Sequence, residues 1–170
     1  YSVYLADDDL ILIVGLSEAI KYLNNNMQYS GAVGKSYMIS TLNNQPFGKI
    51  SNLTDYNLRS YDDNDKLKRL NSYFNDTRAL CFAVTRTKIF IESYKNIMKL
   101  DRLYQTYVFG ENLQAAVYLG NGKIINTQND YLVRQAHPEN TYHKMDFQNW
   151  SNSKGFEDSE NYLSNYTAGL

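Results

Sequence analysis

The spacing of apolar and polar positions switches along this chain between the two-residue period of a strand and the longer period of a helix. An apolar run at 3–6 predicts a short buried strand that ends at Ala6. Helical spacing follows over 16–23, where Ser17 is the expected N-cap. Positions 29–61 are then strand-like or irregular, with polar breaks.

The second half of the chain continues this alternation. The acidic segment 62–65 is typical of a helix start, because the apolar residues that follow fall on one helical face. The remaining expected elements are a strand at 79–85, helices at 87–100 and 112–119, and strands at 123–127 and 131–135. Alternating strands and helices predict an α/β fold over residues 1–144, and the polar segment 145–170 reads as a peripheral helix or tail.

Composition limits the number of domains, the kinds of partner and the cellular compartment that are expected. A chain of 170 residues is long enough for one domain with a real core, and a net charge of −1 provides no basic field for nucleic acid. The lone Cys81 excludes an internal disulfide and a cysteine-rich zinc site, which fits a reducing compartment. The apolar stretch 10–16 is too short to span a membrane and no signal peptide is visible, so we expect a cytoplasmic protein.

The acidic triplet Asp7, Asp8 and Asp9 is the strongest chemical feature of the sequence. Carboxylates are the hard oxygen ligands that Mg²⁺ and Mn²⁺ prefer, and a bound cation would offset their mutual repulsion. Ligands of open α/β sheets bind beyond the carboxyl ends of strands, where this triplet is expected to lie. The alternative is an exposed acidic turn that caps the next helix.

Three further side chains are candidates. Glu111 precedes an apolar helical segment and could act as a general base, although an acid favoured by the helix dipole would look the same. Arg134 and His137 stand at the end of an expected strand, where they could bind a pyrophosphate or simply be surface groups. Positions 31–36 (GAVGKS) resemble part of a phosphate-binding loop, but the spacing of that motif is not met.

Taken in order, these segments resemble the second part of a GT-A glycosyltransferase, most closely the inverting enzymes of the large family-two type. The stretch 5–9 (LADDD), before an apolar helix, resembles their DxD region. The stretch 81–87 (CFAVTRT) resembles the acceptor-side strand, which ends in an arginine before a helix, here Arg86. Glu111, ahead of Gly120-Asn121-Gly122, resembles the catalytic segment. The stretch 131–135 (YLVRQ) resembles the strand after it, and the resemblance covers about residues 1–137.

The resemblance implies a GT-A-like, Rossmann-like mixed sheet flanked by helices. It implies that Asp7, Asp8 and Asp9 hold Mn²⁺ or Mg²⁺ on the diphosphate of a nucleotide sugar, and that the ion acts as a Lewis acid. The pair Asp7 and Asp9 fits a D-x-D register, whereas Asp8 is the best ligand if Ala6 replaces the first acid of a DxDD motif.

The same resemblance implies that Glu111 deprotonates an acceptor hydroxyl and that the sugar is transferred with inversion. It makes Arg86, Arg134 and His137 candidates for contacts with the donor. The expected partners are a nucleotide-sugar donor and a glycan or other hydroxyl acceptor, in surface glycan or polysaccharide synthesis. The expected location is the cytoplasm, including the inner face of the membrane.

Three departures from the family pattern matter. Asn112 stands where the family usually has aspartate, and no Q-x-x-R-W motif is present. The nucleotide-binding half of the family fold precedes the DxD strand, so we expect that half to be missing from this sequence. A non-catalytic module that binds a carbohydrate or a partner therefore stays open as the alternative, and the 16 tyrosines suit sugar stacking as well as a core.

Overall fold

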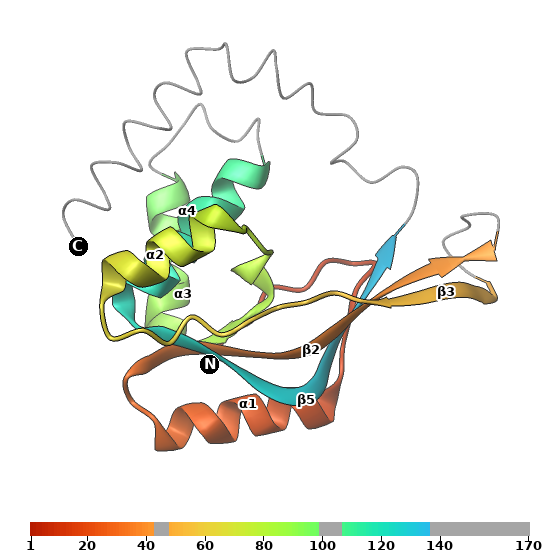
Figure 1. The fold of residues 1–170 in the computed structure, drawn as a ribbon, viewed down its shortest axis with the longest axis horizontal. Helices are drawn as coiled ribbons and strands as arrows, with labels where there is room; N and C mark the ends of the chain where they lie inside the picture. The colour runs from red at the N-terminus through yellow and green to blue at the C-terminus, as the bar shows by residue number, and fades with distance from the viewer. Residues whose placement is uncertain (43–47, 99–106, 137–170) are drawn as a thin grey trace, which may run out of the picture.

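A computed structural model describes residues 1–42, 48–98 and 107–136 of the chain (Figure 1). Along these residues the elements are β1 (Leu10–Ile11), α1 (Ile13–Asn25), β2 (Tyr29–Thr41), β3 (Ile50–Asp55), α2 (Lys66–Asn75), the short 3₁₀ helix η2 (Leu80–Phe82), β4 (Val84–Thr85), α3 (Thr87–Met98), α4 (Tyr107–Asn121) and β5 (Lys123–Ala136). The expected α/β fold, a mixed sheet flanked by helices, is confirmed.

One mixed sheet organises the described residues. Its strands run in the order β1-β5-β2-β3, and β4 pairs with the first part of β2. The central pair β2 and β5 is parallel, whereas the pairs β1–β5, β2–β3 and β2–β4 are antiparallel. Helix α1 covers one face of the sheet, and α2, α3 and α4 gather on the other (Figure 1).

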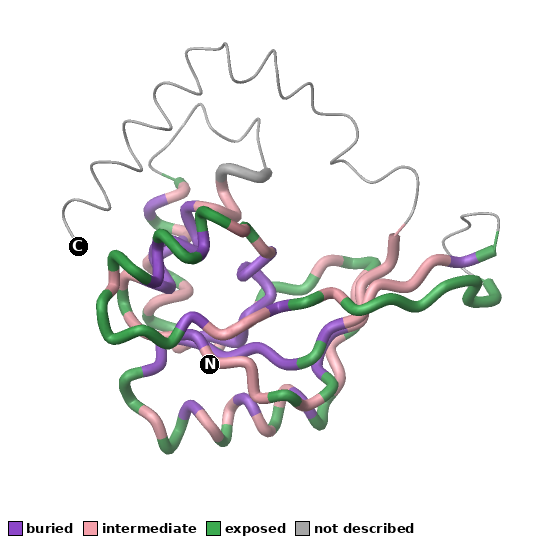
Figure 2. Tube along the Cα trace, viewed as in Figure 1, coloured by how far each residue is buried: buried purple, intermediate pink, exposed green. Residues whose placement is uncertain are grey.

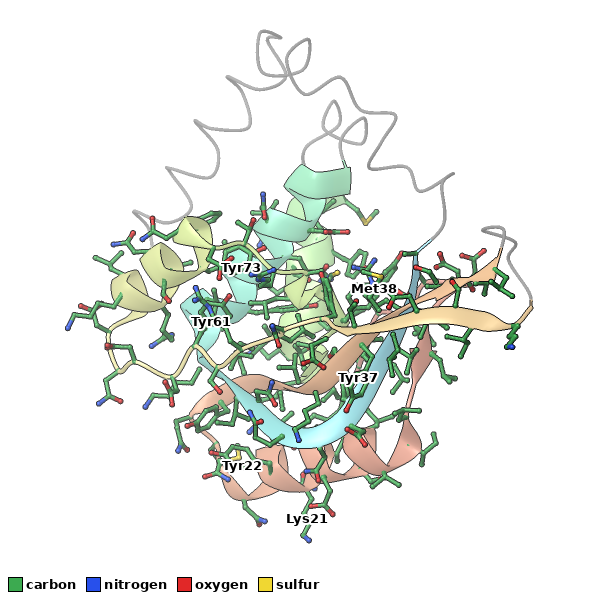
Figure 3. All side chains as sticks on the ribbon, turned by 45° about the vertical axis from the view of Figure 1, so that its right-hand side comes forward. Lys21, Tyr22, Tyr37, Met38, Tyr61 and Tyr73 are labelled. Atoms are coloured by element: carbon green, nitrogen blue, oxygen red, sulfur yellow. The ribbon has the colours of Figure 1, made fainter. Side chains whose placement is uncertain are left out.

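The core is continuous through the sheet from α1 to the three helices on the opposite face (Figure 2). Large tyrosine side chains fill much of it, and Tyr73, Tyr118 and Tyr131 are at most 1% exposed. A buried hydroxyl needs a partner, and the hydroxyl of Tyr131 donates to the carbonyl of Phe82 at 2.6 Å. The rings of Tyr61 and Tyr73 meet edge to face, with centroids 5.8 Å apart (Figure 3).

Helix α1 begins earlier than its apolar spacing predicted. Its N-cap is Leu12, which provides no side-chain cap, so the prediction of Ser17 as N-cap was wrong. Gly15 explains how the helix lies so close to β5: an added Cβ would stand 2.1 Å from the carbonyl oxygen of Asp130. Ala19 and Leu23 continue the same buried face.

Helix α2 begins where the acidic segment predicted it. Asp65 is its N-cap, and its carboxylate accepts from the backbone N–H of Leu67 at 2.8 Å. The buried Arg69 then ties α2 to the end of α4, since its Nε and Nη2 donate to the carbonyl of Leu119 at 3.0 and 2.8 Å. Its Nη1 also donates to the carbonyl of Asp63 at 2.7 Å.

Several other expectations need correction. Residues 3–6 form no regular strand; Ser2 makes an isolated bridge to Thr85, and the first strand is β1. The expected strand over 79–85 is divided into η2 and the short β4. Helix α3 forms residues 87–98 of the helix expected over 87–100, and α4 contains the helix expected over 112–119. The two strands expected over 123–135 are one strand, β5, interrupted by a bulge.

The segment 31–36, which echoed a phosphate-binding loop, lies inside strand β2. No phosphate-binding loop is formed there, as its spacing indicated. His137 and the expected tail 145–170 lie outside the described residues.

Candidate functional site

The acidic triplet meets the end of β5. The carboxylate of Asp9 forms an ion pair with Arg134, with 3.3 Å between Oδ2 and Nε, and its other oxygen accepts from the backbone N–H of Gln135 at 3.3 Å. The pair is largely buried, because the side chains of Asp9 and Arg134 are 1% and 16% exposed. Two sequence candidates from opposite ends of the described chain therefore come into direct contact.

Aromatic rings hold the guanidinium of Arg134. Its central carbon lies 4.5 Å from the ring centre of Phe82 and 5.0 Å from that of Tyr56. Burial opposes its charge, but Tyr56 and Asp9 together raise the pKa of Arg134. The arginine is thus a fixed cation at the carboxyl end of β5.

The carboxyl group of Asp9 responds differently to the same surroundings. Burial raises its pKa above the ordinary value of 3.8, and Asp8 raises it further, while Arg134 and the N–H of Gln135 act in the opposite direction. The net shift is upward, so desolvation outweighs the neighbouring cation.

Asp7 and Asp8 lie differently from Asp9. Both are exposed in the turn that the N–H of Asp9 closes on the carbonyl of Ala6 at 3.3 Å. Asp9 is engaged by Arg134, whereas the other two acids of the triplet, Asp7 and Asp8, are exposed. Mg²⁺ is commonly held by one or two carboxylates together with substrate phosphates, so this pair fits such an ion. Within the described ranges, no group of three or more histidine, cysteine, aspartate or glutamate side chains could hold a metal by itself.

Glu111 approaches the same region from α4. It lies in the second turn of that helix, since α4 begins at Tyr107 rather than at Glu111. Burial raises the pKa of the Cys81 thiol; Glu111 raises it further and Arg134 lowers it. Tyr4 has a raised pKa as well, first through burial and then through Cys81, Tyr94, Glu111 and Asp9. Glu111 therefore acts electrostatically on both Tyr4 and Cys81, as Asp9 does on Tyr4 and Arg134 does on Cys81.

The neighbour of Glu111 has a structural partner. Asn112 stands at the position where the resembled family usually has an acid, and its Oδ1 accepts from the hydroxyl of Tyr73 at 2.9 Å. This bond joins α4 to α2. The amide is thereby used for packing the helices together.

Arg86 lies at the opposite end of α1 from the Asp9–Arg134 ion pair. Its Nε donates to the carbonyl of Tyr29 at 2.9 Å, and its Nη2 donates to those of Leu23 and Asn26 at 2.8 and 3.2 Å. These carbonyls lie at and just after the carboxyl end of α1, whereas Asp9 precedes its amino end. A helix of 13 residues is about 20 Å long, so Arg86 is remote from the Asp9 ion pair and instead stabilises the end of α1.

The sequence did not single out Tyr4, Tyr56 or Phe82. Tyr4 and Phe82 lie with ring centres 5.8 Å apart and form an aromatic wall beside Arg134. Their only sequence signal was apolar character, which is equally typical of a core. The electrostatic effect of Glu111 and Arg134 on Cys81 likewise had no sequence signal beyond the uniqueness of the cysteine.

Comparison with protein-family models, curated proteins and solved structures finds no match to this chain. The fold and the site therefore rest on their own geometry. None of the helices in the described ranges has the length and apolar character needed to cross a membrane.

Proposed function

We propose that this chain carries the metal-binding turn and the acceptor side of a GT-A-like glycosyltransferase site. The reaction is transfer of a sugar from a nucleotide-sugar donor to a hydroxyl acceptor with inversion, in glycan synthesis in the cytoplasm. The observation that supports it is the buried ion pair of Asp9 with Arg134, together with Glu111, which acts electrostatically on the nearby Tyr4 and Cys81. Two acids and a cation suit a reaction in which a proton leaves a hydroxyl and an anionic group departs.

In this proposal Glu111 is the general base. Its carboxylate takes the proton of the acceptor hydroxyl as that oxygen bonds to the anomeric carbon and the bond from that carbon to the diphosphate breaks. The electron pair of the broken bond leaves with the nucleoside diphosphate. The electrostatic effect of Glu111 on both Tyr4 and Cys81 supports this role.

Asp7 and Asp8 are the residues that would hold Mn²⁺ or Mg²⁺, which supplies positive charge to the departing diphosphate. Arg134 is a positioning residue: its ion pair with Asp9 fixes the turn on which the two exposed acids lie. His137, the other candidate for a phosphate contact, remains a sequence-based hypothesis.

The test is turnover of a panel of nucleotide sugars with Mn²⁺ by the chain and four variants. Asp8→Asn and Glu111→Gln should each lower the rate by about a hundredfold or more, the usual contribution of a general base or metal-bound charge. Asp62→Asn and Glu18→Gln are the matched controls, since Asp62 is exposed, the side chain of Glu18 is 45% exposed, and both acids lie outside the cluster. Equal activity in all four variants would overturn the assignment.

The alternative function is a non-catalytic domain that binds a carbohydrate or a partner. The role of Asn112 favours this alternative. An amide stands where the resembled family has a second acid, and it is hydrogen-bonded to Tyr73, so Glu111 is the one acid of the resembled catalytic segment. A chain that binds a nucleotide sugar with Mn²⁺ but releases no nucleoside diphosphate from any donor in the panel would support this alternative.

A further inference from the structure

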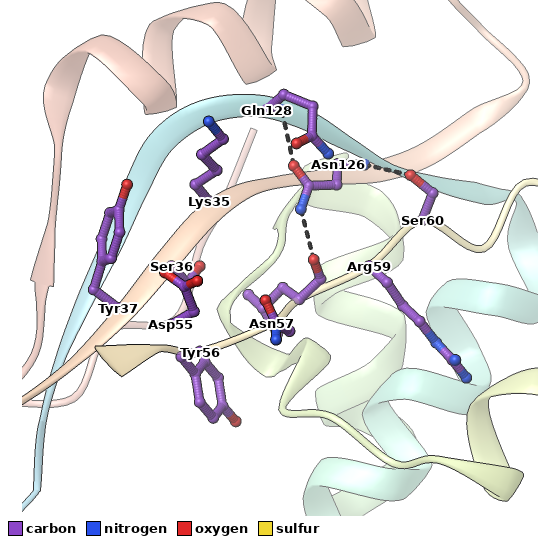
Figure 4. Close-up of a pocket in the computed structure, with 11 residues that line it drawn as sticks. Lys35, Ser36, Tyr37, Asp55, Tyr56, Asn57, Arg59, Ser60, Asn126 and Gln128 are labelled. Atoms are coloured by element: carbon purple, nitrogen blue, oxygen red, sulfur yellow. Dashed lines mark hydrogen bonds between the residues drawn. The ribbon is translucent and has the colours of Figure 1, made fainter. Parts of the chain in front are cut away.

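A polar pocket of about 450 Å³ lies apart from the acidic turn, in the size range of small-molecule sites (Figure 4). Its walls come from three segments: the middle of β2, the chain from Asp55 at the end of β3 to Ser60, and the bulge of β5. The segment 56–60 is fixed at both ends, because Tyr56 N–H donates to Ser36 at 2.7 Å and Tyr61 bridges to Ile124.

The wall on β5 is an unusual piece of backbone. In the parallel pairing Val33 faces Asn126 and Lys35 faces Asp130, so three residues of β5, 127–129, are set against Gly34 alone. Gly34 permits this approach, since an added Cβ would stand 2.3 Å from the carbonyl oxygen of Asn129. Gln128, at the centre of the bulge, has a φ of 65°, a backbone conformation that residues other than glycine rarely adopt.

The surrounding structure maintains this strained conformation through Asn126. The side chain of Asn126 accepts from the N–H of Gln128 at 2.8 Å and donates to the carbonyl of Leu58 at 2.6 Å, and its own N–H donates to the hydroxyl of Ser60 at 2.9 Å (Figure 4). Strained residues that are held in this way are common at binding sites, because the strained backbone can direct a side chain to a position that a relaxed backbone would not reach. Here it places Gln128 on the pocket wall.

The pocket also holds polar groups that the fold itself does not use. Within the described residues, the side chains of Lys35, Asp55, Asn57 and Gln128 have no hydrogen-bond or ion-pair partner. Lys35 and Tyr37 share one face of β2 because side chains two residues apart do so, and Asp55 is the cross-strand partner of Tyr37. Donors and acceptors therefore converge on one cavity.

Their chemistry selects a class of ligand. The charges of Lys35 and Asp55 cancel, and the guanidinium of Arg59 is engaged by Asp76 at 3.3 Å. A phosphate or a free cation would find a balanced pair rather than an opposite charge. Two carboxamides, one ammonium and one carboxylate match groups that both donate and accept, which is the property of sugar hydroxyls. The hydroxyl of Tyr37 is committed to Asp130, which leaves its ring as an apolar surface at the rim.

We propose that this pocket is a saccharide-binding subsite in which Gln128, Asn57 and Lys35 bind sugar hydroxyls. Tyr56 links it to the candidate active site, since it lines the pocket while its ring contacts the guanidinium of Arg134. The role of the subsite in holding a more distant sugar of the acceptor glycan rests on the proposed function; saccharide binding itself does not.

The experiment is NMR titration of the ¹⁵N-labelled chain with N-acetylglucosamine, galactose and rhamnose, and separately with inorganic phosphate. At least one sugar should shift the side-chain amide signals of Asn57 and Gln128 in a saturable manner, and phosphate should not. Lys35→Gln and Gln128→Gly should each weaken the binding of that sugar about three- to tenfold, the effect of one lost hydrogen bond. Asp62→Asn, at an exposed residue that does not line the pocket, is the control that should bind as the parent does.

Gln128→Gly separates binding from folding. Glycine adopts a positive φ without strain, so this variant should unfold at a higher urea concentration than the parent while it binds the sugar more weakly. The proposal is overturned if none of the three sugars moves these signals, if phosphate moves them as strongly, or if Lys35→Gln and Gln128→Gly bind as well as the parent. The two proposals can fail separately. If the chain turns over no nucleotide sugar but both the parent and Glu111→Gln bind a sugar at this pocket, the proposed enzyme is disproved and the subsite is retained.

Discussion

Arg134 and Asp9 are 125 residues apart in the sequence, yet their side chains form a largely buried ion pair with 3.3 Å between Nε and Oδ2. The pair joins the turn before β1 to the end of β5, strands that are also antiparallel neighbours through Leu10 and Val133. A contact of this separation makes the acidic turn depend on the far end of the described chain. The turn should therefore be sensitive to changes in β5.

Arg134→Met should lower the free energy of unfolding by about 3 kcal/mol, because it leaves the Asp9 carboxylate buried without its cation. In the double variant with Asp9→Asn, much of that loss should be recovered, since no buried charge then remains unpaired. Urea denaturation of the parent, both single variants and the double variant measures the coupling energy. Strictly additive losses would show that the two side chains do not interact.

The raised pKa of Asp9 predicts a specific pH dependence of stability. The folded chain takes up this proton at a higher pH than the unfolded chain, whose value is near the ordinary 3.8. The penalty for burying the carboxylate is thus fully present above the raised pKa and is relieved as the pH falls through it towards 3.8. Lowering the pH through this window should therefore stabilise the parent relative to Asp9→Asn. Urea midpoints of both proteins, measured in parallel from pH 7 to about pH 4, test the sign, and parallel curves would contradict it.

The sequence indicated the elements whose signals are local. Helix α2 begins at its capping residue Asp65, and α3 begins at Thr87 as the apolar spacing predicted, because caps and periodicity act within a few residues. Residues 3–6 were misjudged for the opposite reason. Their apolar character leads them to pack on Phe82 and neighbouring groups, without the backbone partners that would make a strand.

The candidate site was only partly accessible from the sequence. Asp9, Glu111 and Arg134 were chosen by residue type and order. The ion pair of Asp9 with Arg134 and the effect of Glu111 on Cys81 depend on how β5 and α4 are placed in the fold. The same information could not show that Arg86 stabilises the end of α1, since an arginine before a helix has the same appearance in both roles. Gln128 was missed because a positive φ at a glutamine has no sequence signal of its own.

Arg69 predicts a large effect from a residue outside the candidate site. It is 6% exposed and donates to the carbonyls of Leu119, Asp63 and Asn64, so Arg69→Met would leave these acceptors without their partner. We expect a loss of about 3 kcal/mol in the free energy of unfolding. Arg78→Met is the matched control: its ion pair with Asp76 is exposed, and its loss should change stability by less than about 0.5 kcal/mol. Similar urea midpoints for the two variants would refute the structural role of Arg69.

Two glycines in helices, Gly15 and Gly110, should respond in opposite directions to the same substitution. Helix propensity alone favours alanine at both positions by about 0.5–1 kcal/mol. At Gly110 an added Cβ meets nothing within 4 Å, so Gly110→Ala should stabilise the chain by about that amount. At Gly15 the added Cβ would stand 2.1 Å from the backbone oxygen of Asp130, and a backbone atom in the centre of a sheet cannot move aside cheaply. Gly15→Ala should therefore destabilise by about 2 kcal/mol, the usual range for overpacking. Thermal unfolding of both variants decides the matter: a stabilised Gly15→Ala would mean that α1 does not pack against β5 at this distance.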